Sequence, residues 1–174
     1  MGQIADEMGR LAITAYSPDK NVKGMLRGDD MLVLFRDDAY EQYTERDLEP
    51  QLEHIANEVC RAYWRAFLGI AKRAGSTVYR KPEDAWDKTT RQFLKLRPTI
   101  ESHAASSDGS VQTSAVGMRN WQIRIKPGTL AERTETEFVT RLLTAAALLR
   151  RDYTATCVRL QGELEHPGVA NTVP

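Results

Sequence analysis

The sequence predicts an α+β protein made of two similar lobes, each a three-stranded antiparallel meander followed by a long amphipathic helix, with an extra helix between them. Two observations support this: the chain repeats itself, and short β-branched segments separated by turns precede each long helix. At a displacement of 90 residues Thr44-Glu45 falls on Thr134-Glu135. Upstream the displacement is 89, so Gly28 falls on Gly117. An inserted or deleted residue in the turn after this glycine explains the change, because turns tolerate such events best.

A third observation is that an apolar helical face occurs in both copies. Its positions follow steps of three and four over about seven turns, which describes one side of a helix that must be buried. In the first copy they are Leu48, Leu52, Ile55, Val59, Tyr63, Phe67, Ile70 and Ala74, and in the second they are Phe138, Leu142, Ala145, Leu149, Tyr153, Cys157, Leu160 and Leu164. We expect each face to pack on its copy, which predicts an intramolecular pseudo-dimer, either monomeric or a homodimer of whole chains.

The first meander follows a short polar stretch. Residues 1–10 are expected to form a stub or frayed turn. A full-length helix precedes the second meander only, so either the leading helix of the first copy was truncated or residues 1–10 are its remnant. Residues 11–16 alternate apolar and β-branched side chains and predict a strand ending at the turn Ser17-Pro18-Asp19. Residues 22–26 predict a weaker strand, and residues 31–35 a third one after a tight turn.

The first long helix has a start signal and a stop signal. Thr44 to Asp47 resembles a capping box, in which the hydroxyl accepts the Asp47 amide and the carboxylate reaches back. Because Pro50 cannot donate a helical hydrogen bond, we expect the helix to begin at residue 46 or 47, which leaves the proline in the first turn. It should run to Ala74 and stop at Gly75.

The segment between the copies predicts a linker followed by a shorter helix. Residues 78–82 read as the linker, and Pro82 followed by two acids favours a helix start. This helix should carry Trp86, Phe93 and Leu96 on one side and end before Pro98.

The second copy repeats the order of the first. Strands are expected at residues 100–105, 111–116 and 121–125, and a second capping box at Thr134 to Glu137 opens a helix reaching about Glu165. Residues 166–174 contain two prolines and a glycine and are expected to be a disordered tail. The predicted division is a first lobe at 1–80, a second lobe with its leading helix at 81–166, and the tail at 167–174.

Charge is balanced overall but not locally. Lys plus Arg equals Asp plus Glu at 24 each, so no global field draws the protein to nucleic acid or acidic lipid. Residues 72–97 hold eight Lys or Arg and three Asp or Glu, a local excess of five positive charges. The first residues lack the pattern of a signal peptide, and no stretch has the roughly 18 apolar residues of a membrane span. We expect a cytoplasmic protein that does not associate with membranes.

The order of meander and long helix resembles the YbaB/EbfC-type nucleoid-associated proteins. Actinobacterial members often have Ser-Pro-Asp-Gly in the first hairpin followed by a valine-rich strand. Here Ser17-Pro18-Asp19-Lys20 and Ser106-Ser107-Asp108-Gly109 stand in that place, followed by Val22 and Val111. The resemblance covers nearly the whole chain in two copies. It implies a small, non-enzymatic DNA-binding protein of weak sequence specificity, nucleoid-associated, with both halves of the usual homodimer in one chain. Domains of this shape also occur among proteins associated with type VII secretion, which implies protein binding instead.

Positive side chains are the candidate DNA contacts. Lys88, Arg91 and Lys95 recur at steps of three and four, so they share one helical face that could follow a phosphate backbone. The alternative is a solvated face whose late cations complement the helix dipole. Arg61 and Arg151 are equivalent and are expected to pair with carboxylates of the facing lobe. The full set of candidate phosphate contacts is Lys72, Arg73, Arg80, Lys81, Lys88, Arg91 and Lys95.

An enzyme is disfavoured by the sequence. His54, His103 and His166 fall in different predicted elements, and no Gly-rich phosphate loop or recognisable nucleophile context is present. Cys60 and Cys157 have neither disulfide-framework nor metal-ligand spacing. We therefore expect no catalytic residue, metal or cofactor. Two functions remain open, a DNA-binding protein and an adaptor or chaperone-like module that holds a protein partner on its sheet or helix face.

Overall fold

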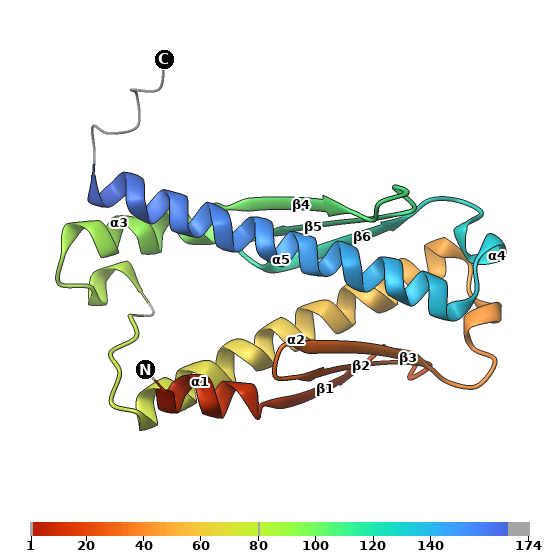
Figure 1. Ribbon diagram of the computed structural model, residues 1–174, viewed down its shortest axis with the longest axis horizontal. Coiled ribbons are helices and arrows are strands. Elements are labelled where there is room, and N and C mark those ends of the chain that lie inside the picture. The colour runs from red at the N-terminus through yellow and green to blue at the C-terminus, as the bar shows by residue number, and fades with distance from the viewer. Residues whose placement is uncertain (1, 80, 167–174) are drawn as a thin grey trace, which may run out of the picture.

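A computed structural model describes residues 2–79 and 81–166 and confirms the α+β class. Two three-stranded antiparallel sheets are each followed by a long helix, with a further helix between them (Figure 1). The first sheet is β1 (Ala12–Tyr16), β2 (Val22–Arg27) and β3 (Asp30–Phe35), and the second is β4 (Glu101–Ala105), β5 (Val111–Val116) and β6 (Arg119–Ile125). The helices are α1 (Gly2–Gly9), α2 (Glu45–Arg73), α3 (Lys88–Leu96), α4 (Thr129–Glu132) and α5 (Glu135–Glu165). None of the helices in these ranges is long and apolar enough to cross a membrane.

The first hairpin turn of each sheet is built in the same way. The Ser17 hydroxyl donates to Asp19 Oδ1 at 2.6 Å and accepts the Val22 amide at 2.9 Å. The counterpart Ser106 donates to Asp108 at 2.7 Å and accepts from the following strand at 3.0 Å. Both serines are buried, and a buried hydroxyl must be hydrogen-bonded. These paired turns explain why the Ser-x-Asp pattern occurs twice.

Asp108 holds the second turn to the long helix that follows it. Its carboxylate accepts hydrogen bonds from the Ser110 hydroxyl at 2.7 Å and from Arg141 Nε at 2.6 Å, and Arg133 lies 3.1 Å away. The hydrogen bonds from Ser110, then Arg141 and Ser106, favour the charged form and hold the pKa of Asp108 well below its usual range.

We expect Asp108→Asn to destabilise the protein at neutral pH and to matter less in acid. A depressed folded pKa gives stability that is present above the unfolded pKa, near 3.9, and is lost as pH falls towards the folded pKa. The difference in urea midpoint between wild type and variant should therefore shrink from pH 7 to about pH 3. A difference that stayed constant with pH would show that the turn, and not the charge, carries the effect.

Helix α2 begins earlier than expected, so the predicted start at residue 46 or 47 is wrong. The N-cap is Thr44, whose carbonyl accepts the Leu48 amide at 3.0 Å and whose hydroxyl accepts the Asp47 amide at 3.3 Å. These bonds fix the first turn, and the helix tolerates the donor missing at Pro50. The Asp47 carboxylate accepts from the Thr44 hydroxyl at 2.6 Å, whereas the second helix has the complete capping box.

The carboxyl end of α2 follows the prediction. Gly75 has a φ of +68°, and the Ser76 amide donates back to the Ala71 carbonyl at 2.9 Å. This arrangement is a Schellman motif, which a glycine in the left-handed conformation favours.

The expectation of a stub or frayed turn at residues 1–10 is wrong, because residues 2–9 form α1. The end of α1 packs against the turn after β2 in the first sheet. The segment before β4 packs in the same way against the turn after β5 in the second sheet. A Cβ on Gly28 would lie 2.8 Å from the Gly9 carbonyl oxygen, and one on Gly117 would lie 2.6 Å from that of Pro98. Both glycines also have positive φ, at +57° and +58°. The two copies thus share a leading helix, short in both, and a glycine turn that allows it to approach.

Helix α3 begins six residues later than predicted. Residues 82–84 form a single 3₁₀ turn, and the chain then extends before Asp87 caps α3 by accepting the Thr90 amide at 2.7 Å. Trp86 therefore lies outside the helix, with 82% of its surface exposed. A proline followed by acids suits a 3₁₀ turn as well as a helix, which explains the error.

The two long helices do not pack along each other over their full length, so the expected packing of each apolar face on its copy is not confirmed. Helix α2 lies along β6 and on β1 and β2, whereas α5 lies on β4 and β5. Only the first four positions of each apolar face are buried in both helices, from Leu48 to Val59 and from Phe138 to Leu149. Beyond these positions the helices diverge (Figure 1), and Tyr63 is already 38% exposed.

A ladder of α2 side chains closes the outer edge of β6. Glu45, Glu49, Glu53 and Asn57 stand four residues apart on one face of the helix. Their side-chain oxygens accept the backbone amides of Leu130 at 3.1 Å, Ile125 at 2.8 Å, Ile123 at 3.0 Å and Trp121 at 3.2 Å. An edge strand otherwise leaves such amides unpaired. The positions 90 residues later in α5 are Glu135, Val139, Leu143 and Ala147, so the two lobes differ here.

Candidate nucleic-acid interface

The predicted phosphate contacts come from three segments at the same end of the molecule. Lys72 and Arg73 form the last turn of α2, Lys81 precedes the 3₁₀ turn, and Lys88, Arg91 and Lys95 lie on α3. This is the end where α1, α3 and the carboxyl ends of α2 and α5 are found (Figure 1). Arg80 lies outside the described residues.

Some of these cations have partners within the protein. Arg73 forms an ion pair of 2.7 Å with Glu7 of α1, and this hydrogen bond lowers the pKa of Glu7. Arg91 donates to the Ala85 carbonyl at 3.0 Å, and Lys81 lies 4.0 Å from Glu83. Within residues 2–79 and 81–166, Lys72, Lys88 and Lys95 form no ion pair. Those three are therefore the cations most available to an external anion.

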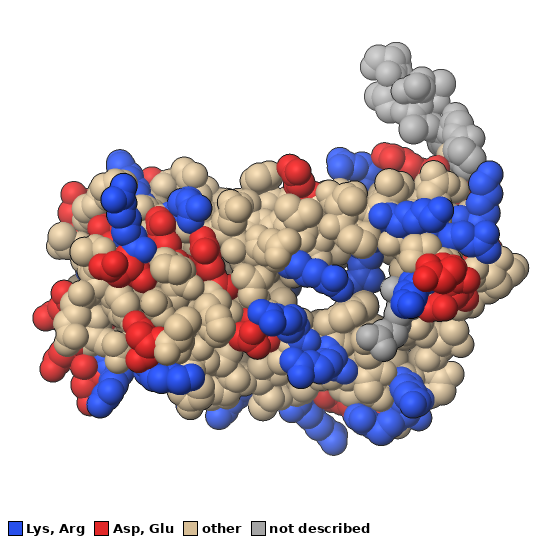
Figure 2. All heavy atoms as spheres, turned by 180° about the vertical axis from the view of Figure 1, so that it is seen from behind, with Lys and Arg blue, Asp and Glu red and all other residues tan. Residues whose placement is uncertain are grey.

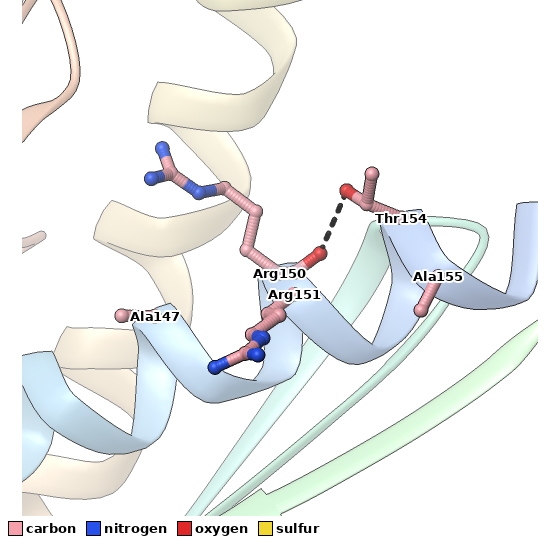
Figure 3. A pocket seen from close by; sticks show the side chains of 5 residues that line it. All are labelled: Ala147, Arg150, Arg151, Thr154 and Ala155. Carbon is pink, nitrogen blue, oxygen red and sulfur yellow. Dashed lines mark hydrogen bonds between the residues drawn. The ribbon is translucent and has the colours of Figure 1, made fainter. Parts of the chain in front are cut away.

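Further cations border an opening between the two diverging helices. Figure 2 shows Lys and Arg side chains around this opening, while carboxylates are more frequent at the other end of the same face. A hollow of about 500 Å³ is lined here by one side of α5. Its lining residues are Ala147, Arg150, Arg151, Thr154 and Ala155, and Figure 3 shows the Arg150 side chain extending towards the neighbouring helix.

The two arginines of this hollow are weakly engaged. Arg150 lies 3.8 Å from Asp29, whose side chain is 95% exposed, so solvent screens the pair. Arg151 forms no ion pair within the described part of the chain. The Thr154 hydroxyl already donates to the Arg150 carbonyl at 2.9 Å. The hollow can therefore attract an anion through two guanidinium groups.

The predicted pairing of Arg61 and Arg151 with the facing lobe is wrong. Arg61 pairs with Glu58 of its own helix at 2.8 Å, three residues away. Such local pairs form readily on a helix surface, and the divergence of α2 and α5 separates the two lobes here. The repeat correctly indicated equivalent positions but could not reveal that the helices separate.

Arg97 connects the two lobes, a role that sequence reasoning missed. Its guanidinium lies 4.5 Å from the centre of the Trp64 ring on α2, and its Nε donates to the Tyr153 hydroxyl on α5 at 3.1 Å. Burial raises the pKa of Tyr153, and the nearby Arg97 opposes that rise. In the sequence, Arg97 contributes only to the local excess of positive charge in residues 72–97. Its position immediately before Pro98, where the chain turns into β4, is the signal that could have identified it.

The structure offers no cluster suited to metal binding in residues 2–79 and 81–166. His54 lies on α2 and His103 on β4, whereas His166, expected in the tail, is the C-cap of α5. The rest of the predicted tail, residues 167–174, lies outside the described residues. Burial raises the pKa of the Cys60 thiol.

Comparisons of this chain with protein-family models, curated proteins and solved structures find no match. The arrangement of residues alone therefore supports an assignment. The candidate interface brings together available cations on α3, α2 and α5 in a protein of zero formal net charge. Such a surface can bind a polyanion through its backbone without reading its sequence.

Proposed function

We propose that this protein is a non-enzymatic, nucleoid-associated type of DNA-binding protein that binds duplex DNA with weak sequence specificity, as its YbaB/EbfC-like pattern suggests. The supporting observation is that α2 and α3 bring cations to one end of a neutral molecule, and that Lys and Arg side chains also surround the opening seen in Figure 2. Lys72, Lys88 and Lys95 are free of ion pairs within the described segments. They would neutralise phosphates, and the remaining predicted cations would add to this field.

The rival function is an adaptor that holds a protein partner, and salt separates the two. Phosphate contacts release counterions, so seven Lys or Arg contacts would make the binding constant fall with roughly the sixth power of salt. Between about 50 and about 150 mM salt, the affinity would drop about 10³-fold. An apolar protein interface would respond little.

We expect wild-type protein to retard duplex DNA in a gel-shift titration at low salt and Lys88→Glu/Arg91→Glu/Lys95→Glu to lose this binding. The matched control is Lys20→Glu/Lys23→Glu/Arg27→Glu on the first sheet, which changes net charge equally but leaves the proposed surface intact. A third variant, Lys88→Gln/Arg91→Gln/Lys95→Gln, removes the charges without introducing repulsion and should weaken binding less.

Three results would count against DNA binding. They are no shift by wild type at low salt, equal loss in the control variant, and full binding by the α3 variant. A pull-down from native cytoplasm beside the gel shift tests the adaptor directly. Circular dichroism of each variant shows whether α3 stays folded, since Arg91 also bonds Ala85.

A further inference from the structure

The outer face of the first sheet carries an exposed apolar patch. We define this patch as Tyr16, Met25, Leu32 and Leu34. The strand register places Tyr16, Lys23 and Leu34 in one row across the sheet and Thr14, Met25 and Leu32 in the next. Tyr16, Leu32 and Leu34 are 46–47% exposed, whereas their strand neighbours Ala15 and Val33 on the inner face are buried.

The second sheet gives an internal comparison. Its corresponding rows are Ala105, Gln112 and Arg124, and His103, Ser114 and Gln122, so polar side chains cover most of its outer face. One partly exposed apolar residue, Val116, lies near its end. The same architecture therefore folds with a polar outer face, and the apolar patch is a property of the first lobe alone. Clustered apolar side chains on one exposed face are typical of a protein contact.

Positive charges lie within and beside the patch. Lys20 and Lys23 each place Nζ 5.9 Å from the centre of the Tyr16 ring, and Arg27 follows on the same face of β2. A third row holds Ala12, Arg27 and Asp30, and Asp30 is the acid within these three rows. The face thus interleaves apolar side chains with positive charges.

These charges disfavour a second copy of the chain as the partner. Two face-to-face dimers place the twofold axis over β2, either along the strand or across it. The central strand β2 then stacks on its own copy, with Lys23 opposite either Lys23 or Arg27 of the other chain. Either arrangement brings like charges together over an apolar contact, which opposes association.

We propose that this face docks an amphipathic helix of a partner protein, with an apolar stripe flanked by carboxylates. The outer strands of a three-stranded sheet are about 10 Å apart, which matches the diameter of one α-helix. The stripe would cover Leu32, Leu34 and Met25, and the carboxylates would pair with Lys23 and Arg27. This docking surface uses residues other than the cations of α3 and stands independently of DNA binding.

The test uses the intact chain and two synthetic helical peptides with one shared leucine stripe at i, i+3, i+4 and i+7. One peptide carries Glu beside the stripe and the other Lys, and fluorescence anisotropy of labelled peptide gives the affinity. We expect the Glu peptide to bind at least about tenfold more tightly than the Lys peptide. Leu32→Gln/Leu34→Gln should weaken it at least about tenfold, and the matched variant Val116→Gln should not. Lys23→Glu/Arg27→Glu should reverse the peptide preference.

Several results would overturn the proposal. They are no binding of the Glu peptide, equal binding by Leu32→Gln/Leu34→Gln, and tighter binding of the Lys peptide. Sedimentation of the intact chain could also overturn it. If wild type were a dimer and Leu32→Gln/Leu34→Gln a monomer, the face would be assigned to a second copy of the chain. Since both leucines are nearly half exposed, these variants should fold, and circular dichroism verifies this.

Discussion

Leu142→Asp and Leu52→Asp are each expected to unfold the protein or to lower its thermal midpoint severely. The two leucines are equivalent in the repeat, are 4% and 2% exposed, and belong to one hydrophobic cluster that joins both lobes. A carboxylate at either position loses its hydration without gaining a partner, which costs several kcal/mol. Because a domain is stable by only about 5–15 kcal/mol, one substitution can remove most of this margin.

Two exposed positions supply matched controls for this prediction. His54 lies two residues from Leu52 on the same helix, and Thr144 lies two residues from Leu142; both are exposed. His54→Asp and Thr144→Asp therefore introduce the same side chain away from the helix ends but on the solvent-facing side. Surface substitutions usually change stability by about 0.5 kcal/mol. Thermal unfolding followed by circular dichroism compares the pairs. Equal midpoints within a pair would show that the leucine is not part of the core.

Much of the fold could be predicted because its signals are local. The turns at Ser17 and Ser106, the Thr134 capping box and the Gly75 stop depend on hydrogen bonds within a few residues, which the sequence displays directly. The strand positions followed from these turns to within one or two residues. The errors at the starts of α2 and α3 arose where two local rules competed, a cap against a proline and a 3₁₀ turn against a helix.

The remaining features depend on contacts between distant segments. A repeat shows which positions are equivalent but not how the copies are arranged, so the divergence of α2 from α5 could not be inferred. The candidate site suffers from the same limit. Lys88 and Lys95 could be placed on a helix, whereas the contribution of Arg150 and Arg151 required the hollow that one side of α5 lines. The bridging role of Arg97 likewise requires both Trp64 and Tyr153 in place.

The carboxylate ladder of α2 shows most clearly how a contact between distant segments escapes prediction from the sequence. Glu45, Glu49 and Glu53 at steps of four would be interpreted as a solvated face, yet each accepts a backbone amide from the other lobe. The recipients Ile123 and Ile125 are 3% and 4% exposed, so water has little access to replace the glutamates. The ladder therefore substitutes for the neighbouring strand that β6 lacks.

Glu49→Ala/Glu53→Ala is expected to destabilise the protein by about 2–6 kcal/mol, because each buried amide left without an acceptor costs about 1–3 kcal/mol. Glu49→Gln/Glu53→Gln keeps an acceptor oxygen at both positions and should lose much less. Glu53 also pairs with Arg124 at 2.9 Å, but Arg124 is 60% exposed and Arg124→Ala should cost no more than about 1 kcal/mol. Urea unfolding of the four proteins, with hydrogen exchange at the Ile123 and Ile125 amides, measures these effects. If the Ala and Gln variants are equally stable, or the two amides stay protected in the Ala variant, α2 does not hold the β6 edge through these side chains.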